Sequence, residues 1–424
     1  MTDSYGGLER AIARVLAHFP FVKKIAKSSY AKLMYMKHRK GYQFKSSKEV
    51  ELVASSSDKD TFFGYFDKSP MSSSGFTLVH RSLRSTSELP SEHDCVQLCV
   101  YDDLGNSIFE LETQAYNWQQ GSRAHWLNED LFIFNDFDEE IGKYVSRVCS
   151  IQQKKQIKQF DFPVQDSFRD KYFLSINYRR LMTLRPDYGY RNLPNLSMDE
   201  QRKTTNDGIW KVNLESGDHR MLFSIDDVMN IDWDKNFENT VHKLNHVMIS
   251  PSGDRFIFLH RYYVGKRRVD RLLIANADGE DIRVLANFGM VSHCFWADNK
   301  TVLGYLKGHN GQNAYWLINV DSGEFRHFAE GKLDQYGDGH PHVVGDWFVT
   351  DTYPDKARMQ TLLYCNWKTG EIRSLGEFFH GFSFNEETRC DLHPRMSIDG
   401  KYIFFDSVFD GSRQLYRMKA PLHD

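Results

Sequence analysis

The sequence lacks the features that would assign it to several common classes of protein. Its 424 residues contain six cysteines but no CxxC pair, and Cys95 and Cys99, on one expected strand, lie too far apart to bridge easily. No Gly-rich phosphate loop and no nucleophile elbow occurs in the chain. The formal net charge of only -3 argues against a nucleic-acid-binding protein.

A long apolar run is also absent. No segment approaches the roughly eighteen consecutive apolar residues of a membrane span. The opening sequence MTDSYGGLERAIARVLAHFP carries charges through its apolar stretch and has no small-residue cleavage site, so it does not resemble a signal peptide. Together with thiols that have no evident partner, these absences predict a cytoplasmic protein.

Helical periodicity is confined to the N-terminal part of the chain, and we place the boundary of this extension at residues 1–41. Apolar side chains recur with helical spacing over residues 7–40, interrupted by Pro20, and basic side chains lie between them. One interpretation is peripheral contact with the anionic inner face of a membrane. The other is a helix that packs on the rest of the protein or on a partner.

Residues 42–424 contain most of the strand signals. The chain has 31 Phe, 21 Tyr and 8 Trp, residues that favour strands over helices. Four histidines stand at the same place in successive repeats, each a few residues before a turn and an apolar run. They are His246, His293, His340 and His393. Their spacings of 47, 47 and 53 residues are typical of four-stranded propeller blades.

Three earlier segments, near Tyr65, Arg123 and Asn177, open in the same way, which makes seven repeats. The sequence therefore predicts an all-β, seven-bladed β-propeller with an N-terminal α-helical extension. Only three strands are evident in the last repeat. We expect the N-terminal run GYQFKSSKEVELVAS to supply the fourth and close the ring, which removes exposed strand edges.

The repeated histidines predict a site on the axis of the propeller. The innermost strand of every blade lines the central channel, so equivalent positions form a ring around one point. Imidazoles that face one channel repel when protonated, and a divalent metal or an acidic ligand resolves that repulsion. We take His293, His340 and His393 as candidate metal ligands. His342, two residues after His340 and on the same side of its strand, is a further candidate.

Polar and cationic side chains are expected around the mouth of this pocket, which suits an anionic ligand. The long segment 185–192 is predicted to cover it as a lid. A histidine before a turn also has a purely structural interpretation, as a cap or a satisfied hydrogen-bonding group. The candidate substrate-binding residues are Tyr65, His260, Arg395, Tyr188, Arg191 and Tyr353.

Over residues 205–420 the chain resembles the oligogalacturonate lyases, seven-bladed propellers that use manganese to eliminate uronic-acid oligosaccharides. The motifs LNHVMISPSGDRFIFLH, SHCFWADNK and DLHPRMSIDGKYIFFDS carry the resemblance. It implies a catalytic-base role for His246, metal-ligand roles for His293 and His393, and manganese as cofactor. Arg395 and Cys390 stand where the family has a histidine and a glutamine, so His340 is expected to complete the ligand set.

Two classes of function remain open. The first is a metal-dependent lyase that acts on an acidic, uronate-containing oligosaccharide or polysaccharide by β-elimination, with manganese, zinc or iron as the metal. His246 then takes the proton, and Arg261 or Arg123 stabilises the developing charge. Epimerisation at C5 begins with the same proton abstraction. The alternative is a non-catalytic propeller that binds a glycan or a protein in bacterial envelope polysaccharide biosynthesis.

Overall fold

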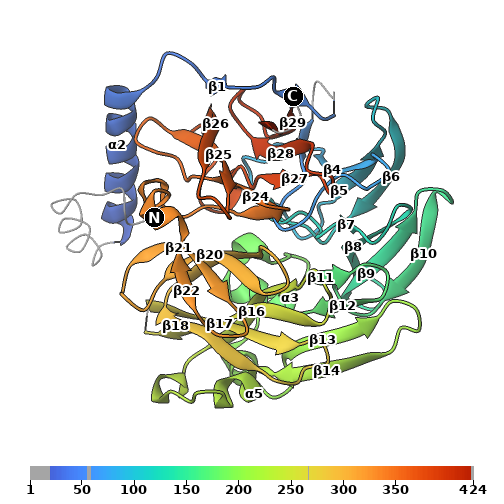
Figure 1. The fold of residues 1–424 in the computed structure, drawn as a ribbon. Coiled ribbons are helices and arrows are strands. Elements are labelled where there is room, and N and C mark those ends of the chain that lie inside the picture. Colours follow the sequence, from blue (N-terminus) through green and yellow to red (C-terminus); the bar gives the residue numbers. More distant parts are fainter. Residues whose placement is uncertain (1–19, 55–58, 266, 422–424) are drawn as a thin grey trace.

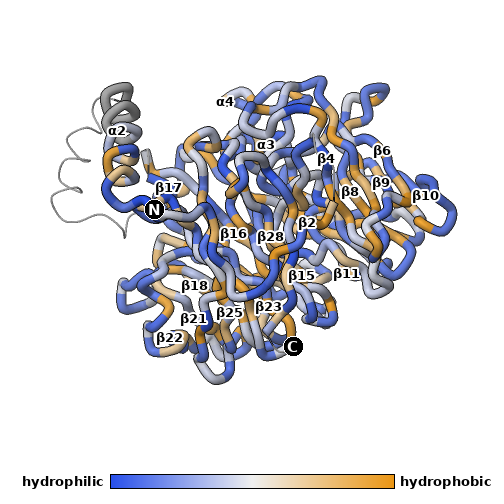
Figure 2. The backbone as a smooth tube through the Cα atoms, turned by 90° about the horizontal axis from the view of Figure 1, so that it is seen from above, coloured by the Kyte–Doolittle hydropathy of each residue, from blue (hydrophilic) through white to orange (hydrophobic). Residues whose placement is uncertain are grey.

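The strands form seven antiparallel sheets around a central axis (Figure 1). The computed structural model describes residues 20–54, 59–265 and 267–421. Apolar stretches run along the strands, and hydrophilic ones lie at the outer turns (Figure 2). The buried hydrophobic side chains gather mainly between neighbouring blades. This architecture confirms the predicted all-β, seven-bladed propeller.

The blades follow one another along the chain, and within each blade the strands succeed one another from the axis outward. Blades one to three are β3 (Asp60–Phe62), β4 (Thr77–Ser82), β5 (Val96–Tyr101), β6 (Ser107–Thr113); β7 (His125–Trp126), β8 (Leu131–Asp138), β9 (Lys143–Ser150), β10 (Lys155–Phe160); and β11 (Asp166–Phe168), β12 (Tyr172–Ser175), β13 (Gly208–Asn213), β14 (His219–Ser224). Blades four and five are β15 (His242–Ile249), β16 (Arg255–Val264), β17 (Arg267–Asn276), β18 (Arg283–Gly289); and β19 (Val291–Trp296), β20 (Thr301–Lys307), β21 (Asn313–Asn319), β22 (Phe325–His327). Blades six and seven are β23 (His342–Val344), β24 (Trp347–Asp351), β25 (Met359–Asn366), β26 (Ile372–Phe379), β1 (Phe44–Ser46); and β27 (Arg395–Met396), β28 (Tyr402–Ser407), β29 (Gln414–Lys419), β2 (Glu51–Leu52).

The ring is closed by strands from the two ends of the propeller. β2 pairs antiparallel with β29, and the backbone N–H of Val53 donates to the carbonyl of Leu415 at 3.0 Å. The N-terminal run therefore supplies the fourth strand of blade seven, as predicted. β1, just before it, adds a fifth strand to blade six through its pairing with β26.

The third blade differs from the sequence prediction by one strand. Its innermost strand is β11, and the segment near Asn177 is not an inner strand at all. The side chain of Asn177 instead accepts a hydrogen bond from the backbone N–H of Arg180 and caps α3 (Tyr178–Leu184). Asparagine is a strong N-cap residue, so the polar segment that follows β12 forms short helices before the chain returns as β13. These are α3, the 3-10 helix η2 (Pro186–Tyr188) and α4 (Met198–Arg202).

Helix α2 (Pro20–His38) stands beside blade six (Figure 1). The ring of Tyr35 lies 5.5 Å from the rings of both Phe379 and Phe382, and Lys40 forms an ion pair with Glu377 at 2.5 Å. The remainder of the predicted helical segment, residues 7–19, lies outside the described residues. None of the helices described is long and apolar enough to cross a membrane.

Candidate functional site

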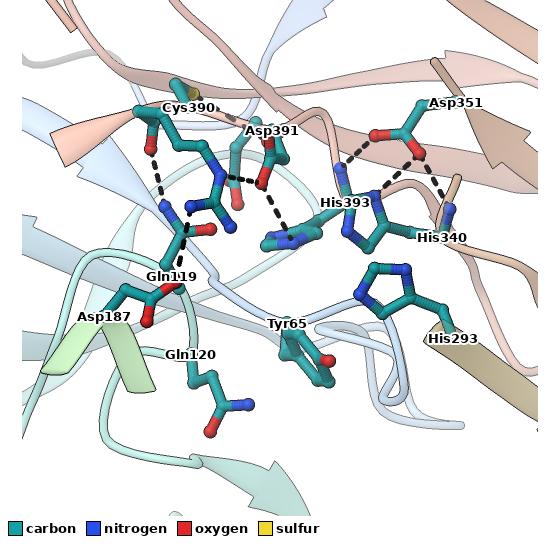
Figure 3. Close-up of polar contacts among 12 residues, drawn as sticks. Tyr65, Gln119, Gln120, Asp187, His293, His340, Asp351, Cys390, Asp391 and His393 are labelled. Atoms are coloured by element: carbon teal, nitrogen blue, oxygen red, sulfur yellow. Dashed lines mark hydrogen bonds and ion pairs between the residues drawn. The ribbon is translucent and has the colours of Figure 1, made fainter. Parts of the chain in front are cut away.

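The four repeated histidines converge at one end of the central channel. His246 and His293 lie on β15 and β19, and His340 and His393 come just before β23 and β27. Between successive rings the centroid distances are 5.9, 4.2 and 4.3 Å, from His246 through His293 and His340 to His393. The last three of these side chains are drawn in Figure 3. All but His246, which is partly buried, are buried.

The backbone is distorted where these side chains turn toward the axis. His246 and His393 have φ angles of 51° and 42°, in the left-handed region that residues other than glycine seldom adopt. The pairing register shifts between Asn245 and Met248 in β15, and again between Val291 and Cys294 in β19. Bulges re-aim side chains, and strain of this kind is retained mainly at functional sites.

Three of the buried groups form a candidate metal site. The ligand atoms of His340, Asp391 and His393 all lie within 4.8 Å of one another. Among the described residues, His340 Nε2, His393 Nε2 and Asp391 Oδ1 have no hydrogen-bond partner. Buried polar atoms are normally paired, so unpartnered atoms on three neighbouring residues indicate a shared ligand. Two imidazoles and a carboxylate form a donor set that fits a divalent transition metal.

Hydrogen bonds on the far side of the rings orient these ligands (Figure 3). Asp351 Oδ1 accepts from His340 Nδ1 at 2.8 Å, and Asp351 Oδ2 accepts from the backbone N–H of His393 at 3.1 Å. His393 Nδ1 donates to the carbonyl of Gly64 at 3.0 Å. In both rings the proton is thereby held on Nδ1, which leaves the Nε2 lone pair directed into the candidate metal site.

The carboxylates set the charge of this group. Burial alone would lower the pKa of His340, but the Asp351 carboxylate more than offsets it and raises the pKa. Burial raises the pKa of Asp391, but the neighbouring Arg389 and His340 lower it further, so the carboxylate stays ionised. Arg389 Nε donates to Asp391 Oδ2 at 2.7 Å, which leaves Oδ1 free.

Asp391 was not among the residues singled out from the sequence. Its position two residues before His393 was the available signal in the sequence. His293, predicted as a ligand, lies beside this group rather than within it. Its Nδ1 is 3.3 Å from Asp338 Oδ1, and burial followed by the charge of His340 lowers its pKa to about 4.

His246 lies on the other side of His293 and is held by Tyr65. The hydroxyl of Tyr65 is 2.8 Å from His246 Nδ1. Burial, followed by the positive charges of Arg261 and His293, lowers the pKa of His246 well below 6.5, so its imidazole is neutral. Burial raises the pKa of Tyr65 well above 10, so the phenol keeps its proton. The pair provides a neutral, oriented base in a closed environment.

The segment between β12 and β13 covers this end of the channel. The ring of Tyr188 lies 5.7 Å from Tyr65 and 5.6 Å from His246. Asp187 pairs with Arg389 at 3.3 Å, and Arg191 pairs with Glu387. The cavity that Tyr65 and His246 line measures only about 10 Å³, enough for a water molecule or an ion but not for a sugar.

Two of the arginines predicted to act in the site already form ion pairs with carboxylates of the protein. Arg123 forms two hydrogen bonds to Asp67, at 2.9 and 2.7 Å, and both side chains are buried. Arg395 pairs with Asp406 at 3.0 Å and also donates to the carbonyl of Gly64. Each guanidinium therefore stabilises the loops around the axis rather than facing an open pocket.

Two predicted histidines point away from the site. His260 precedes Arg261 on β16, and consecutive strand residues face opposite sides, so only Arg261 lies near His246. His260 Nε2 is instead 2.9 Å from His242 Nδ1. His342 Nδ1 donates to the carbonyl of Phe66 at 2.6 Å, and its ring lines a separate cavity of about 560 Å³ at the opposite end of the channel. Tyr353, by contrast, lies near the candidate metal site, with its ring 5.8 Å from that of His340.

Comparisons with known proteins were made at the levels of sequence and structure. No protein-family model matches the chain, and no curated protein matches it. An oligogalacturonate lyase in complex with manganese is 15% identical over 91% of this chain and 95% of its own, with a TM-score of 0.59. An oligogalacturonate lyase from Vibrio parahaemolyticus is 14% identical over 89% and 96%, with a TM-score of 0.57. The chain therefore has the same seven-bladed propeller fold as the oligogalacturonate lyases, which its sequence motifs resemble.

Proposed function

We propose that the chain is a metal-dependent lyase that cleaves a uronate-containing oligosaccharide by β-elimination. The observation that supports this most directly is the position of a neutral, partly buried His246 next to His293, whose ring in turn lies 4.2 Å from that of His340 in the group His340, Asp391 and His393. A base beside a cation site is what the elimination requires.

In this reaction a base removes the proton at C5 of the uronate. The electron pair of the C5–H bond forms a double bond between C4 and C5, the C4–O bond breaks, and the departing oxygen takes up a proton. His246 is suited to take the C5 proton because its imidazole is neutral. Tyr65 fixes the ring through the 2.8 Å hydrogen bond, and Arg261 adds positive charge beside it.

His340, Asp391 and His393 would hold the cation, with His293 beside them. Manganese is the metal that the resemblance implies, and zinc and iron suit the same donors. When bound, such a cation neutralises the uronate carboxylate and so acidifies the proton at C5. Because Tyr188 of the segment between β12 and β13 packs against His246, with ring centroids 5.6 Å apart, entry of an oligosaccharide requires this segment to move.

The test combines metal analysis of the purified protein with an assay for unsaturated product, followed by absorbance in the near ultraviolet. We expect His246→Ala to abolish product formation while metal content stays unchanged, and His393→Ala to lose both. His309→Ala, at an exposed histidine in the turn after β20, serves as the control and should change neither. A wild-type protein that carries no metal and forms no such product from any acidic oligosaccharide would contradict the proposal.

The closed site favours a second candidate function. A non-catalytic propeller that binds a glycan or a protein in bacterial envelope polysaccharide biosynthesis needs no open pocket at the histidines. It predicts that no unsaturated product forms and that His246→Ala leaves binding intact. The same variants and measurements therefore separate the two candidates.

A further inference from the structure

Beside His246, cationic side chains outnumber the carboxylates that neutralise them. Arg261 and Arg268 share Asp270, at 3.1 and 3.0 Å from the same oxygen. Arg185 and Arg389 share Asp187, at 2.8 and 3.3 Å. Arg389 has a second carboxylate in Asp391, at 2.7 Å, so Arg185 and Arg389 are balanced. Asp270 neutralises only one of the two guanidinium charges that it contacts, so the surplus of positive charge lies at Arg261 and Arg268.

Lys243 adds a further charge to this group. It lies on β15, three residues before His246, and its side chain is fully buried. Among the described residues no carboxylate lies within ion-pair distance of its Nζ, which has only the carbonyl of Leu184 at 3.4 Å and the ring of Tyr263 at 6.0 Å. Burial, followed by the charges of Arg261 and Arg185, lowers the pKa of this amine well below 10.5.

A buried ammonium without a negative partner destabilises a folded protein and is retained mainly where a ligand supplies the missing charge. Arg185 and Leu184 belong to the covering segment, whereas Lys243 and Arg261 belong to blade four. Arg185 also stacks on Tyr188, at 4.7 Å from the ring centroid, and Tyr188 in turn contacts His246. The unbalanced charge thus lies at the junction of the cover and the candidate base.

We propose that Lys243, Arg185 and Arg261 form a binding subsite for a carboxylate of the ligand, between the covering segment and blade four. An arginine fork and a lysine point charge together suit a carboxylate. That the carboxylate belongs to a uronate rests on the proposed function, whereas the subsite itself rests on the charges alone. A carboxylate bound there offsets the repulsion between Arg185 and Lys243, so binding holds the cover closed over His246.

The subsite is tested with galacturonate as the probe, on metal-free full-length protein, by calorimetric titration and by the thermal unfolding midpoint. Galactose is the neutral control sugar. We expect galacturonate, but not galactose, to raise the unfolding midpoint of the wild-type protein. Lys243→Met should raise the midpoint without ligand, because it replaces a buried amine that has no carboxylate partner with an apolar side chain, and weaken galacturonate binding at least ten-fold.

Lys211→Met is the matched control, because the Nζ of Lys211 also donates to a backbone carbonyl, that of Ala277 at 2.8 Å, but lies on blade three. This variant should bind galacturonate as the wild type does, with the same rise in the unfolding midpoint. Arg185→Gln gives a second variant, should Lys243→Met fail to fold, and is also expected to lose the response. The subsite is refuted if galacturonate neither binds the wild-type protein nor raises its unfolding midpoint. It is also refuted if Lys243→Met and Arg185→Gln bind galacturonate as tightly as the wild type does. Binding without unsaturated product would instead count against the lyase alone.

Discussion

The ability of a single histidine in this propeller to bind a metal depends on the hydrogen bonds that orient its ring. Asp351 accepts hydrogen bonds from the Nδ1 of His340 and from the backbone of His393, and so holds both Nε2 atoms toward Asp391. We predict that Asp351→Asn leaves the fold intact but weakens binding of a divalent metal by about 10- to 100-fold. Competition with a chelator measures this. Asp298→Asn, at a turn outside the site, is the control, and equal affinities in the two variants would argue against the role of Asp351.

Gly121 shows how little space remains beside one buried histidine. Its φ is 57°, and a Cβ built there would lie 2.4 Å from Cε1 of His80, whose ring stacks on Phe62. Overpacking costs about 1–3 kcal/mol, and left-handed φ adds about 1–2 kcal/mol for a residue with a Cβ. We therefore expect Gly121→Ala to lower the free energy of unfolding by about 3 kcal/mol.

Gly142→Ala separates the two contributions to this loss. Gly142 has a similar φ of 63°, but nothing lies within 4 Å of its added Cβ. Urea unfolding should therefore show a loss of only about 1 kcal/mol, from the backbone alone. Equal losses in the two variants would mean that the contact with His80 does not matter.

At the scale of elements, we expect the short strand β2 to contribute more to stability than its length suggests. It is the fourth strand of blade seven and joins the start of the propeller to its end. We predict that a chain starting at residue 41 stays folded, whereas one starting at residue 55 unfolds at a much lower temperature because blade seven is left with an open edge. Thermal unfolding followed by circular dichroism distinguishes them. Similar midpoints would show that closure contributes little.

Helix α2 has side chains that pack on the propeller and others that are exposed. Tyr35 packs on Phe379 and Phe382, whereas Leu33 and Met36 are 55% and 64% exposed among lysines. We expect the double variant Leu33→Asp and Met36→Asp to fold normally and to bind anionic liposomes less tightly, because an exposed apolar face flanked by basic residues suits such a surface. Cosedimentation measures this, with neutral liposomes as the control. If the double variant cosediments with anionic liposomes as the wild type does, the exposed face of α2 has no role in membrane binding, and only its packing on the propeller remains.

For the whole molecule, buried neutral histidines make stability depend on pH. Burial, before any neighbouring charge, lowers the pKa of His80 and His242 to about 4 and that of His380 to about 3. The unfolded chain binds these protons first, near pH 6.5, so the stability is complete above that pH and falls as the pH drops toward 4. Between pH 7.5 and 5.5 each histidine loses about 1.3 kcal/mol, or about 4 kcal/mol for these three alone.

Urea unfolding at pH 7.5 and 5.5, with a chelator present, measures the direction and magnitude of this change in the free energy of unfolding. His340 contributes in the opposite direction, because Asp351 raises its pKa, but it is a single group. A free energy of unfolding that is equal at the two pH values, or larger at pH 5.5, would contradict the prediction.

The architecture and the position of the axis could be predicted from the repeats. Repeats 47, 47 and 53 residues apart encode one blade each, so His246, His293, His340 and His393 had to meet on the axis once seven blades closed. The fourth strand of the last blade followed from the same repeat count. The third blade was placed one strand late because Asn177 lies in strand-like sequence, although its side chain caps a helix.

Which side chains act together could be seen only in the folded chain. Asp391 and Asp351 come from blades seven and six, and no local pattern relates them to His340. The sequence left Arg123 and Arg395 as free cations, because their partners Asp67 and Asp406 are 56 and 11 residues away along the chain and adjacent only in the folded propeller. Periodicity is a local property that sets strands and faces, whereas ion pairing and burial depend on contacts between strands and between blades.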